Sequence, residues 1–126
     1  MPAFPIIDAH LHIWDPREIR IGWQAGNDAM RRVFDITDYT DQTRGIDIEA
    51  MVFVECFVDR GEFLNEVRHV ERAAKADPRL KAIVAQAALD DGADVRPFLD
   101  HLRDRHPVEP VHEIHEVHEP HAGNDQ

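Results

Sequence analysis

Two histidines separated by one residue lie near the start of the chain, in the segment Asp8-Ala9-His10-Leu11-His12. Neutral imidazoles are among the preferred ligands of zinc and other divalent cations. Side chains alternate between the faces of a β-strand, so Asp8, His10 and His12 are expected to share one face. Two imidazoles about 7 Å apart along one strand face can converge on a single cation. The spacing therefore predicts a divalent-metal site at His10 and His12.

Polar side chains on a buried strand need either hydrogen bonds or a ligand. The alternative to a metal site is a pair of core histidines whose rings bond to backbone carbonyls. The position of the pair favours the metal site, because Asp15-Pro16 breaks the predicted strand directly after it. In parallel α/β folds, sites form at the C-terminal ends of the strands.

Other candidate site residues stand in or beside apolar runs. Glu55 is a carboxylate in the run 49–58, where it is expected either to assist the metal or substrate or to pair with a nearby arginine. Gln86, within the run 82–89, has the same two interpretations, with substrate binding as the functional one. Trp14 is expected to line a substrate pocket or to cover the core.

The elements that must position these residues alternate between strands and helices. Apolar runs typical of buried strands occupy residues 5–13, 49–58 and 82–89. Apolar residues recur at helical spacing over 61–76 and again over 95–102. Thr37 or Asp38 is expected to cap a shorter helix that ends near Gly45. This alternation predicts an α/β fold with a parallel sheet and helices outside it.

The composition of the chain changes at Pro107. Residues 1–106 contain all 14 basic side chains and 20 acidic ones, whereas residues 107–126 contain five acidic side chains and no Lys or Arg. The second segment also repeats a His-Glu-x unit and is interrupted by prolines, which oppose a helix. It is predicted to be a disordered, low-complexity tail. Its histidines can bind metal weakly, but their spacing and the prolines fix no geometry, so a specific metal site is not expected there.

Length and charge exclude several classes of function. A chain of 126 residues with 43% hydrophobic residues suits one modest domain with a packed core. The net charge of −11 disfavours nucleic acid and anionic membrane as partners. The single cysteine excludes an intrachain disulfide, and the N-terminal segment lacks the pattern of a secretory signal, so a cytoplasmic protein is expected.

The run PIIDAHLHIWDP at residues 5–16 resembles the first strand of the amidohydrolase superfamily. Its second half is similar to the sugar-lactonase and pyrone-dicarboxylate-lactonase branch, whose second and third strands would fall at residues 52–55 and 82–85. The resemblance covers residues 5–106 and implies the N-terminal portion of a (β/α)8 TIM barrel, about three βα units long. It further implies metal-assisted hydrolysis of a lactone or related carbonyl compound, with His10 and His12 as the pair on the first strand that binds a divalent metal, zinc being the first candidate, or faces the substrate.

A complete barrel of this type takes about 250 residues. The later strands of the family, which carry its remaining metal ligands and its acid–base aspartate, have no match in this chain. We therefore expect a domain at residues 1–106 that was truncated or frame-shifted near His106 and is inactive alone, binding a small-molecule substrate only if the barrel is completed. The alternative is a non-catalytic remnant or partner-binding fragment. Either form is expected to self-associate or to need a companion chain, because its sheet edges would be unpaired.

Overall fold

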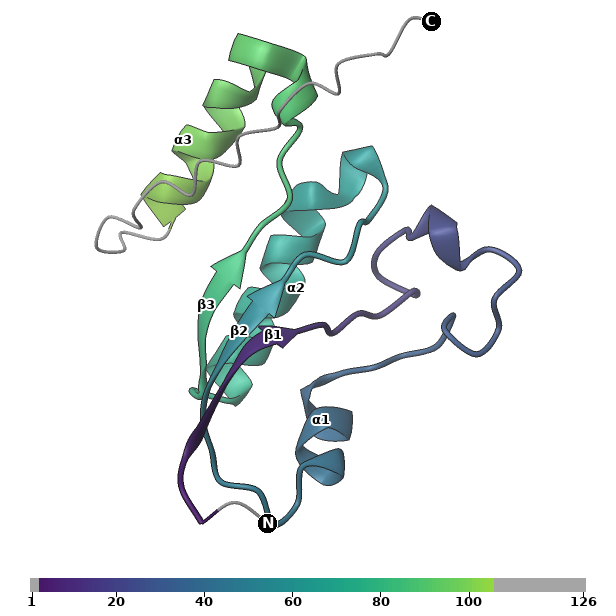
Figure 1. Cartoon of the computed structure of the whole chain (residues 1–126). Helices are drawn as coiled ribbons and strands as arrows, with labels where there is room; N and C mark the ends of the chain where they lie inside the picture. Colours follow the sequence, from purple (N-terminus) through teal and green to yellow (C-terminus); the bar gives the residue numbers. More distant parts are fainter. Residues whose placement is uncertain (1–2, 106–126) are drawn as a thin grey trace, which may run out of the picture.

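A computed structural model describes residues 3–105 of the chain. Three parallel strands, β1 (Ile6–Leu11), β2 (Ile48–Val54) and β3 (Leu80–Val84), form one sheet in the order β1-β2-β3 (Figure 1). The α-helices are α1 (Ile36–Gln42), α2 (Phe63–Ala76) and α3 (Arg96–Arg105). Short 3-10 helices lie at η1 (Gly22–Gln24), η2 (Arg60–Glu62) and η3 (Leu89–Val95). The predicted mixed α/β organisation is confirmed; the tail at 107–126 lies outside the described residues.

The core lies on the side of the sheet that α2 covers. Met51 and Phe53 of β2 are completely buried, and Leu80 of β3 lies beside them. Val67 and Val70, one helical turn apart on α2, present an apolar stripe to these strands and are also fully buried or nearly so. The same buried cluster includes Ile13, Ile19 and Ile21 of the segment after β1, so the helix and this segment both contribute to one hydrophobic core.

The opposite side of the sheet is open within residues 3–105. Ile7 on β1 is 62% exposed and Val84 on β3 is 48% exposed, while Val52 and Val54 of β2 are half-buried. The apolar run at 49–58 predicts a buried strand, but within the described part of the chain β2 is fully buried on one face only. No fourth strand pairs with β1 or β3 in that part, so both strands form edges.

The pairing of β1 with β2 contains an irregularity that changes which side chains share a face. Asp8 is opposite Met51 and Leu11 is opposite Phe53, so β1 uses one residue more than β2 between these two pairs. An extra residue of this kind is a β-bulge, and it reverses the alternation of the side chains after it. Asp8 consequently lies on the same side as Leu11, and the prediction that Asp8 shares a face with His10 and His12 is wrong.

The segment between β1 and α1 forms a long excursion fastened at its two ends. Trp14 and Phe34 exchange backbone hydrogen bonds of 2.8 and 3.0 Å in an isolated antiparallel bridge. The Trp14 indole N–H also donates to the carbonyls of Met30 (3.2 Å) and Arg32 (3.0 Å), and its ring packs edge-on against Phe34. Trp14 is only 8% exposed. Its side chain therefore contributes to the core and to loop closure, and it does not face the cleft described below.

The N-cap of helix α1 lies two or three residues before the positions predicted from the sequence. Asp35 is the N-cap, and its Oδ1 accepts hydrogen bonds from the amides of Thr37 (3.0 Å) and Asp38 (3.1 Å). Asp38 returns a bond, because its Oδ2 accepts the Asp35 amide at 2.9 Å. This reciprocal arrangement is a capping box. Neither Thr37 nor Asp38 is the cap residue.

Loss of this cap gives a first test of the fold. We expect Asp35→Ala to lower the free energy of unfolding by about 1 kcal/mol, since two helix-terminal amides lose their acceptor. The exposed Asp41→Ala change within the same helix removes an equal charge without touching the box and serves as the control. Urea unfolding of both variants measures the difference, and equal stabilities would contradict the assignment of Asp35 as the cap.

None of the helices within residues 3–105 is long and apolar enough to cross a membrane.

Candidate functional site

The two histidines meet at the C-terminal end of β1. Their Nε2 atoms are 3.1 Å apart, and the ring centroids are separated by 4.8 Å in an edge-to-face arrangement. Both residues are exposed. Because Leu11 between them faces the core, the two imidazoles lie toward the open side of the sheet. The rings are thus closer together than the spacing along a regular strand suggests.

This separation is compatible with ligation of one cation. Two imidazole nitrogens bound to one zinc at about 2.0–2.1 Å each are about 3–3.4 Å apart when the angle between them is near tetrahedral or somewhat smaller. The observed Nε2–Nε2 distance falls in this range. Without a cation, the same distance is a hydrogen bond in which one Nε2–H donates to the other ring.

A backbone carbonyl determines the tautomer of His12. The Nδ1 atom of His12 lies 2.9 Å from the carbonyl oxygen of Val54, the last residue of β2. Since a carbonyl oxygen only accepts, Nδ1 carries the hydrogen, and Nε2 of the neutral ring is left with a free electron pair directed at His10. An imidazole oriented through its second nitrogen in this way is the usual arrangement of a metal-binding histidine.

Asp8 is directed away from the histidine rings by the bulge. Its Oδ2 accepts a hydrogen bond of 2.8 Å from the Tyr39 hydroxyl of α1, and its Oδ1 accepts the His10 amide at 3.1 Å. Burial, with a smaller contribution from the Asp8 carboxylate, raises the pKa of Tyr39 to about 12. Asp8 therefore attaches α1 to β1 and fixes the backbone of His10 from below.

Cys56 and Glu66 form a buried layer beneath the pair. The Cys56 thiol lies 3.7 Å from Nδ1 of His12 and 3.6 Å from the carbonyl of Ile13. The Cys56 amide donates to Oε2 of Glu66, a residue of α2 that is 2% exposed. Burial raises the pKa of the Cys56 thiol, and the nearby carboxylates of Glu66 and Glu55 raise it further. The thiol thus stays protonated and behaves as the small buried group that its position suggests.

Glu66 combines a buried charge with an unsatisfied oxygen. Its Oε1 has no hydrogen-bond partner among the described residues. Burial raises its pKa to about 7 against the stabilising hydrogen bond from the Cys56 amide, and the negative charge of Glu55 adds to the rise. Glu66 was not among the residues picked out from the sequence. The available signal was its place on the apolar stripe of α2, three residues after Phe63 and four before Val70.

Glu55 turns back onto its own segment. Its Oε2 accepts a hydrogen bond of 2.6 Å from the amide of Phe57, whose φ angle is 51°. A bulky residue rarely adopts this left-handed conformation, so the Glu55 carboxylate stabilises a strained turn. Neither the predicted substrate role nor pairing with an arginine is evident in these contacts.

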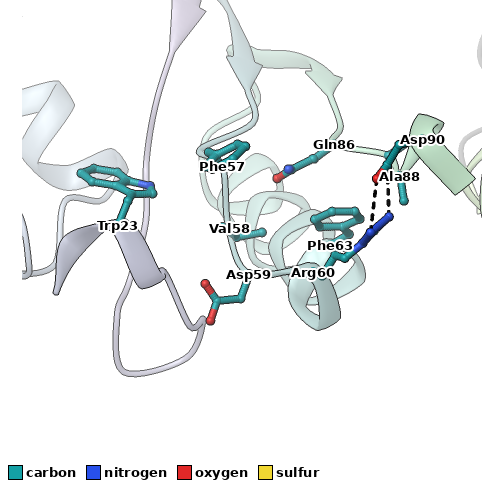
Figure 2. Close-up of a pocket in the computed structure, with 10 residues that line it drawn as sticks. Trp23, Phe57, Val58, Asp59, Arg60, Phe63, Gln86, Ala88 and Asp90 are labelled. Carbon is teal, nitrogen blue, oxygen red and sulfur yellow. Dashed lines mark hydrogen bonds and ion pairs between the residues drawn. The ribbon is translucent and has the colours of Figure 1, made fainter.

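A cleft of about 350 Å³ opens where the loops after the three strands meet (Figure 2). Its lining includes Trp23 of η1, Phe57 from the β2–α2 connection, Phe63 at the start of α2, and Gln86 after β3. The Oε1 atom of Gln86 has no hydrogen-bond partner among the described residues. Of the two predicted substrate-binding residues, Gln86 lines this cleft, whereas Trp14 does not.

A third ligand does not accompany the two histidines within the described residues. Within residues 3–105 no group of three or more His, Cys, Asp or Glu side chains is arranged to hold a metal ion. His10 and His12 lie together, and the side chains of Asp8 and Glu55 are engaged elsewhere. Zinc binding at this pair stays a prediction.

Comparison with known proteins supports the fold. No protein-family model matches the chain, and no curated protein matches its sequence. Among solved structures, the chain is similar to amidohydrolase 2 from Bifidobacterium longum subsp. infantis, with a TM-score of 0.59 and 24% sequence identity. The match covers 69% of this chain and 34% of that one. The chain thus shares the α/β fold of an amidohydrolase over this stretch and spans about a third of that protein's length.

Proposed function

We propose that the chain supplies the first three βα units of a (β/α)8-barrel hydrolase that acts on a lactone or a related carbonyl compound. The observation that carries the proposal is the pair of imidazoles at the C-terminal end of β1, with Nε2 atoms 3.1 Å apart and the His12 tautomer fixed by Val54. The likeness in fold to an amidohydrolase is a second support. The lactone substrate follows from the resemblance of residues 5–16.

His10 and His12 are the residues that would hold a divalent metal, with zinc as the first candidate. When bound, such a cation polarises a carbonyl group and lowers the pKa of water. The chain's own contribution is to orient the rings: Val54 keeps the hydrogen of His12 on Nδ1, and Asp8 holds the His10 amide. Activity requires further ligands and an acid–base group beyond the described residues.

Metal binding to the purified chain tests this proposal directly. We expect Co²⁺ to bind the wild-type chain and His10→Ala/His12→Ala to bind it at least about tenfold more weakly, because both imidazole ligands are lost. The visible absorption of Co²⁺ and its broadening of histidine NMR signals report the site without any need for turnover.

Two controls separate this site from the histidines of the segment 107–126 and from His101. A variant with alanine at His112, His115, His118 and His121 should keep the affinity of the wild-type chain, as should His101→Ala on α3. If binding follows the four tail histidines and not His10 and His12, the proposed metal site is wrong.

The open side of the sheet favours a second candidate, a partner-binding role without catalysis. Parallel sheets occur almost only with both faces covered, yet Ile7 and Val84 are exposed and the described part of the chain leaves both edge strands unpaired. In solutions of the pure chain, the cover that is available is a second copy. Association of two copies through this face, or binding of a companion chain to it, fits either candidate function.

A further inference from the structure

The cleft at the strand ends has aromatic walls that the backbone holds in place. Trp23 is 42% exposed, and its indole N–H donates to the carbonyl of Cys56 at 2.9 Å. Phe57 is 71% exposed and is presented by the turn that Glu55 stabilises. Phe63 adds a third ring to the lining (Figure 2). Exposed rings fixed from beneath lose little conformational entropy on contact with a flat apolar ligand.

The charges around the cleft are unfavourable for an anion. The guanidinium of Arg60 is shared between Asp90, at 3.0 Å, and Asp91, at 2.8 Å. Asp59 also lines the cleft, and one of its oxygens accepts the Gly22 amide at 2.7 Å. Three carboxylates thus accompany one guanidinium, so a bound carboxylate would meet net repulsion and no free cation.

Residues 54–57 connect the backbone that orients His12 with the lining of the cleft. The Val54 carbonyl orients the His12 ring, and the Cys56 carbonyl, two residues later, accepts the hydrogen bond from the Trp23 indole. Phe57 follows directly and lines the cleft. A ligand seated against these rings therefore lies beside the segment that positions the proposed metal ligands.

We propose that this cleft is the ring-binding subsite of the hydrolase and takes uncharged cyclic esters with an apolar or aromatic face, discriminating against carboxylates. The inference rests on the proposed function for its reaction. Ring opening adds one water: the acyl C–O bond breaks, a new C–O bond forms to the water oxygen, one water proton goes to the departing alkoxide, and the other is released to solvent from the new acid. The product thus carries a negative charge that the substrate lacked, and the acidic rim favours its release.

All the residues that line the cleft belong to this chain, so ring binding, unlike turnover, is expected without the remaining strands, contrary to the expectation from the sequence. Binding of three related probes to the full chain tests the proposal. The probes are 3,4-dihydrocoumarin, its ring-opened product 3-(2-hydroxyphenyl)propanoate, and the matching amine 3-(2-hydroxyphenyl)propylamine. We expect the lactone to shift the Trp23 indole NMR signal and to bind about tenfold more tightly than the acid, a difference typical of one unfavourable charge contact. Equal binding of lactone and acid, absence of lactone binding, or tightest binding by the amine would each overturn the proposal.

Variants assign the effect to the cleft. Phe57→Gly removes one ring at a position where glycine tolerates the positive φ, and should weaken lactone binding about tenfold. Asp90→Asn/Asp91→Asn releases Arg60 and should bring the acid to within about threefold of the lactone. Asp100→Asn/Asp104→Asn on α3, an equal change of charge outside the lining, should leave the tenfold difference intact; a failure of either pair to behave so would contradict the charge argument.

The same titration distinguishes this proposal from the proposed function. The His10→Ala/His12→Ala chain should lose Co²⁺ binding and still bind the lactone, since neither histidine lines the cleft. If Co²⁺ binding does not depend on His10 and His12 while the lactone still binds, the metal site alone is wrong. If the chain binds Co²⁺ at His10 and His12 but does not bind the lactone, the subsite alone is wrong.

Discussion

Replacing Glu66 by glutamine should stabilise the chain at pH 8 and have little effect at pH 4. The folded chain keeps the Glu66 proton up to a pKa of about 7, whereas the ordinary value is 4.5. Between these values the unfolded chain has released a proton that the folded chain still holds, so the contribution of Glu66 to stability falls as the pH rises through this window. Above pH 7 the ionised, buried Glu66 lowers the free energy of unfolding by a constant amount of about 3 kcal/mol.

Glutamine keeps an oxygen that can accept the Cys56 amide and removes the ionisable group. We expect Glu66→Gln to be about 2–3 kcal/mol more stable than the wild-type chain at pH 8 and within about 1 kcal/mol of it at pH 4. Urea unfolding at pH 4, 6 and 8 measures the difference. Glu49→Gln, at an exposed position of β2, is the control and should show no such pH dependence. A stability difference that is the same at all three pH values would contradict the assignment.

The second large effect concerns the open side of the sheet. We expect the pure chain to self-associate, and Ile7→Lys/Val84→Lys to weaken the association by about 100-fold or more, because two apolar side chains would no longer be buried between copies. Each single variant, Ile7→Lys and Val84→Lys, is expected to weaken the association to the same extent. The two positions lie on opposite edge strands, so a contact at one edge alone would not produce equal effects.

Sedimentation velocity over a concentration series measures this association. Leu99→Lys on α3 alters a side chain that is 41% exposed, close to the 48% of Val84, but away from the sheet, and it should leave the association unchanged. A wild-type chain that stays monomeric throughout the series would contradict the prediction. An association that Leu99→Lys disrupts as strongly would move the contact to α3.

The strands and helices were predictable because their apolar residues recur with the period of each element. The run Val52-Phe53-Val54 predicts β2, and the apolar repeat from Phe63 to Ala74 predicts α2. The two ends of the elements were less well predicted: β3 begins at Leu80 and ends at Val84, whereas the sequence suggested 82–89. Residues 85–88 continue the apolar run, but they leave the sheet, and residues 86–88 line the cleft.

The candidate site was predictable in its residue types and only partly in its geometry. His10 and His12 were identified from their spacing, but the bulge that separates Asp8 from them depends on pairing with β2, which no local pattern in β1 encodes. The contacts of Val54 with His12 and of Glu66 with Cys56 join residues 42 and 10 positions apart, respectively. Such contacts follow from tertiary packing, so the sequence pattern of a single element does not reveal them.

The bulge in β1 also separates two kinds of constraint within three residues of the chain. Asp8, before the bulge, bonds to Tyr39 and so affects how α1 sits on the sheet, whereas His10 and His12, after it, face the open side. In a strand with strict alternation, Asp8 and His10 would be neighbours on one surface, and a substitution at either would disturb the other. Here the two residues are coupled through one backbone hydrogen bond, from the His10 amide to Asp8, so replacing the His10 side chain leaves the bond between Tyr39 and Asp8 in place, whereas replacing Asp8 affects both α1 and the backbone of His10.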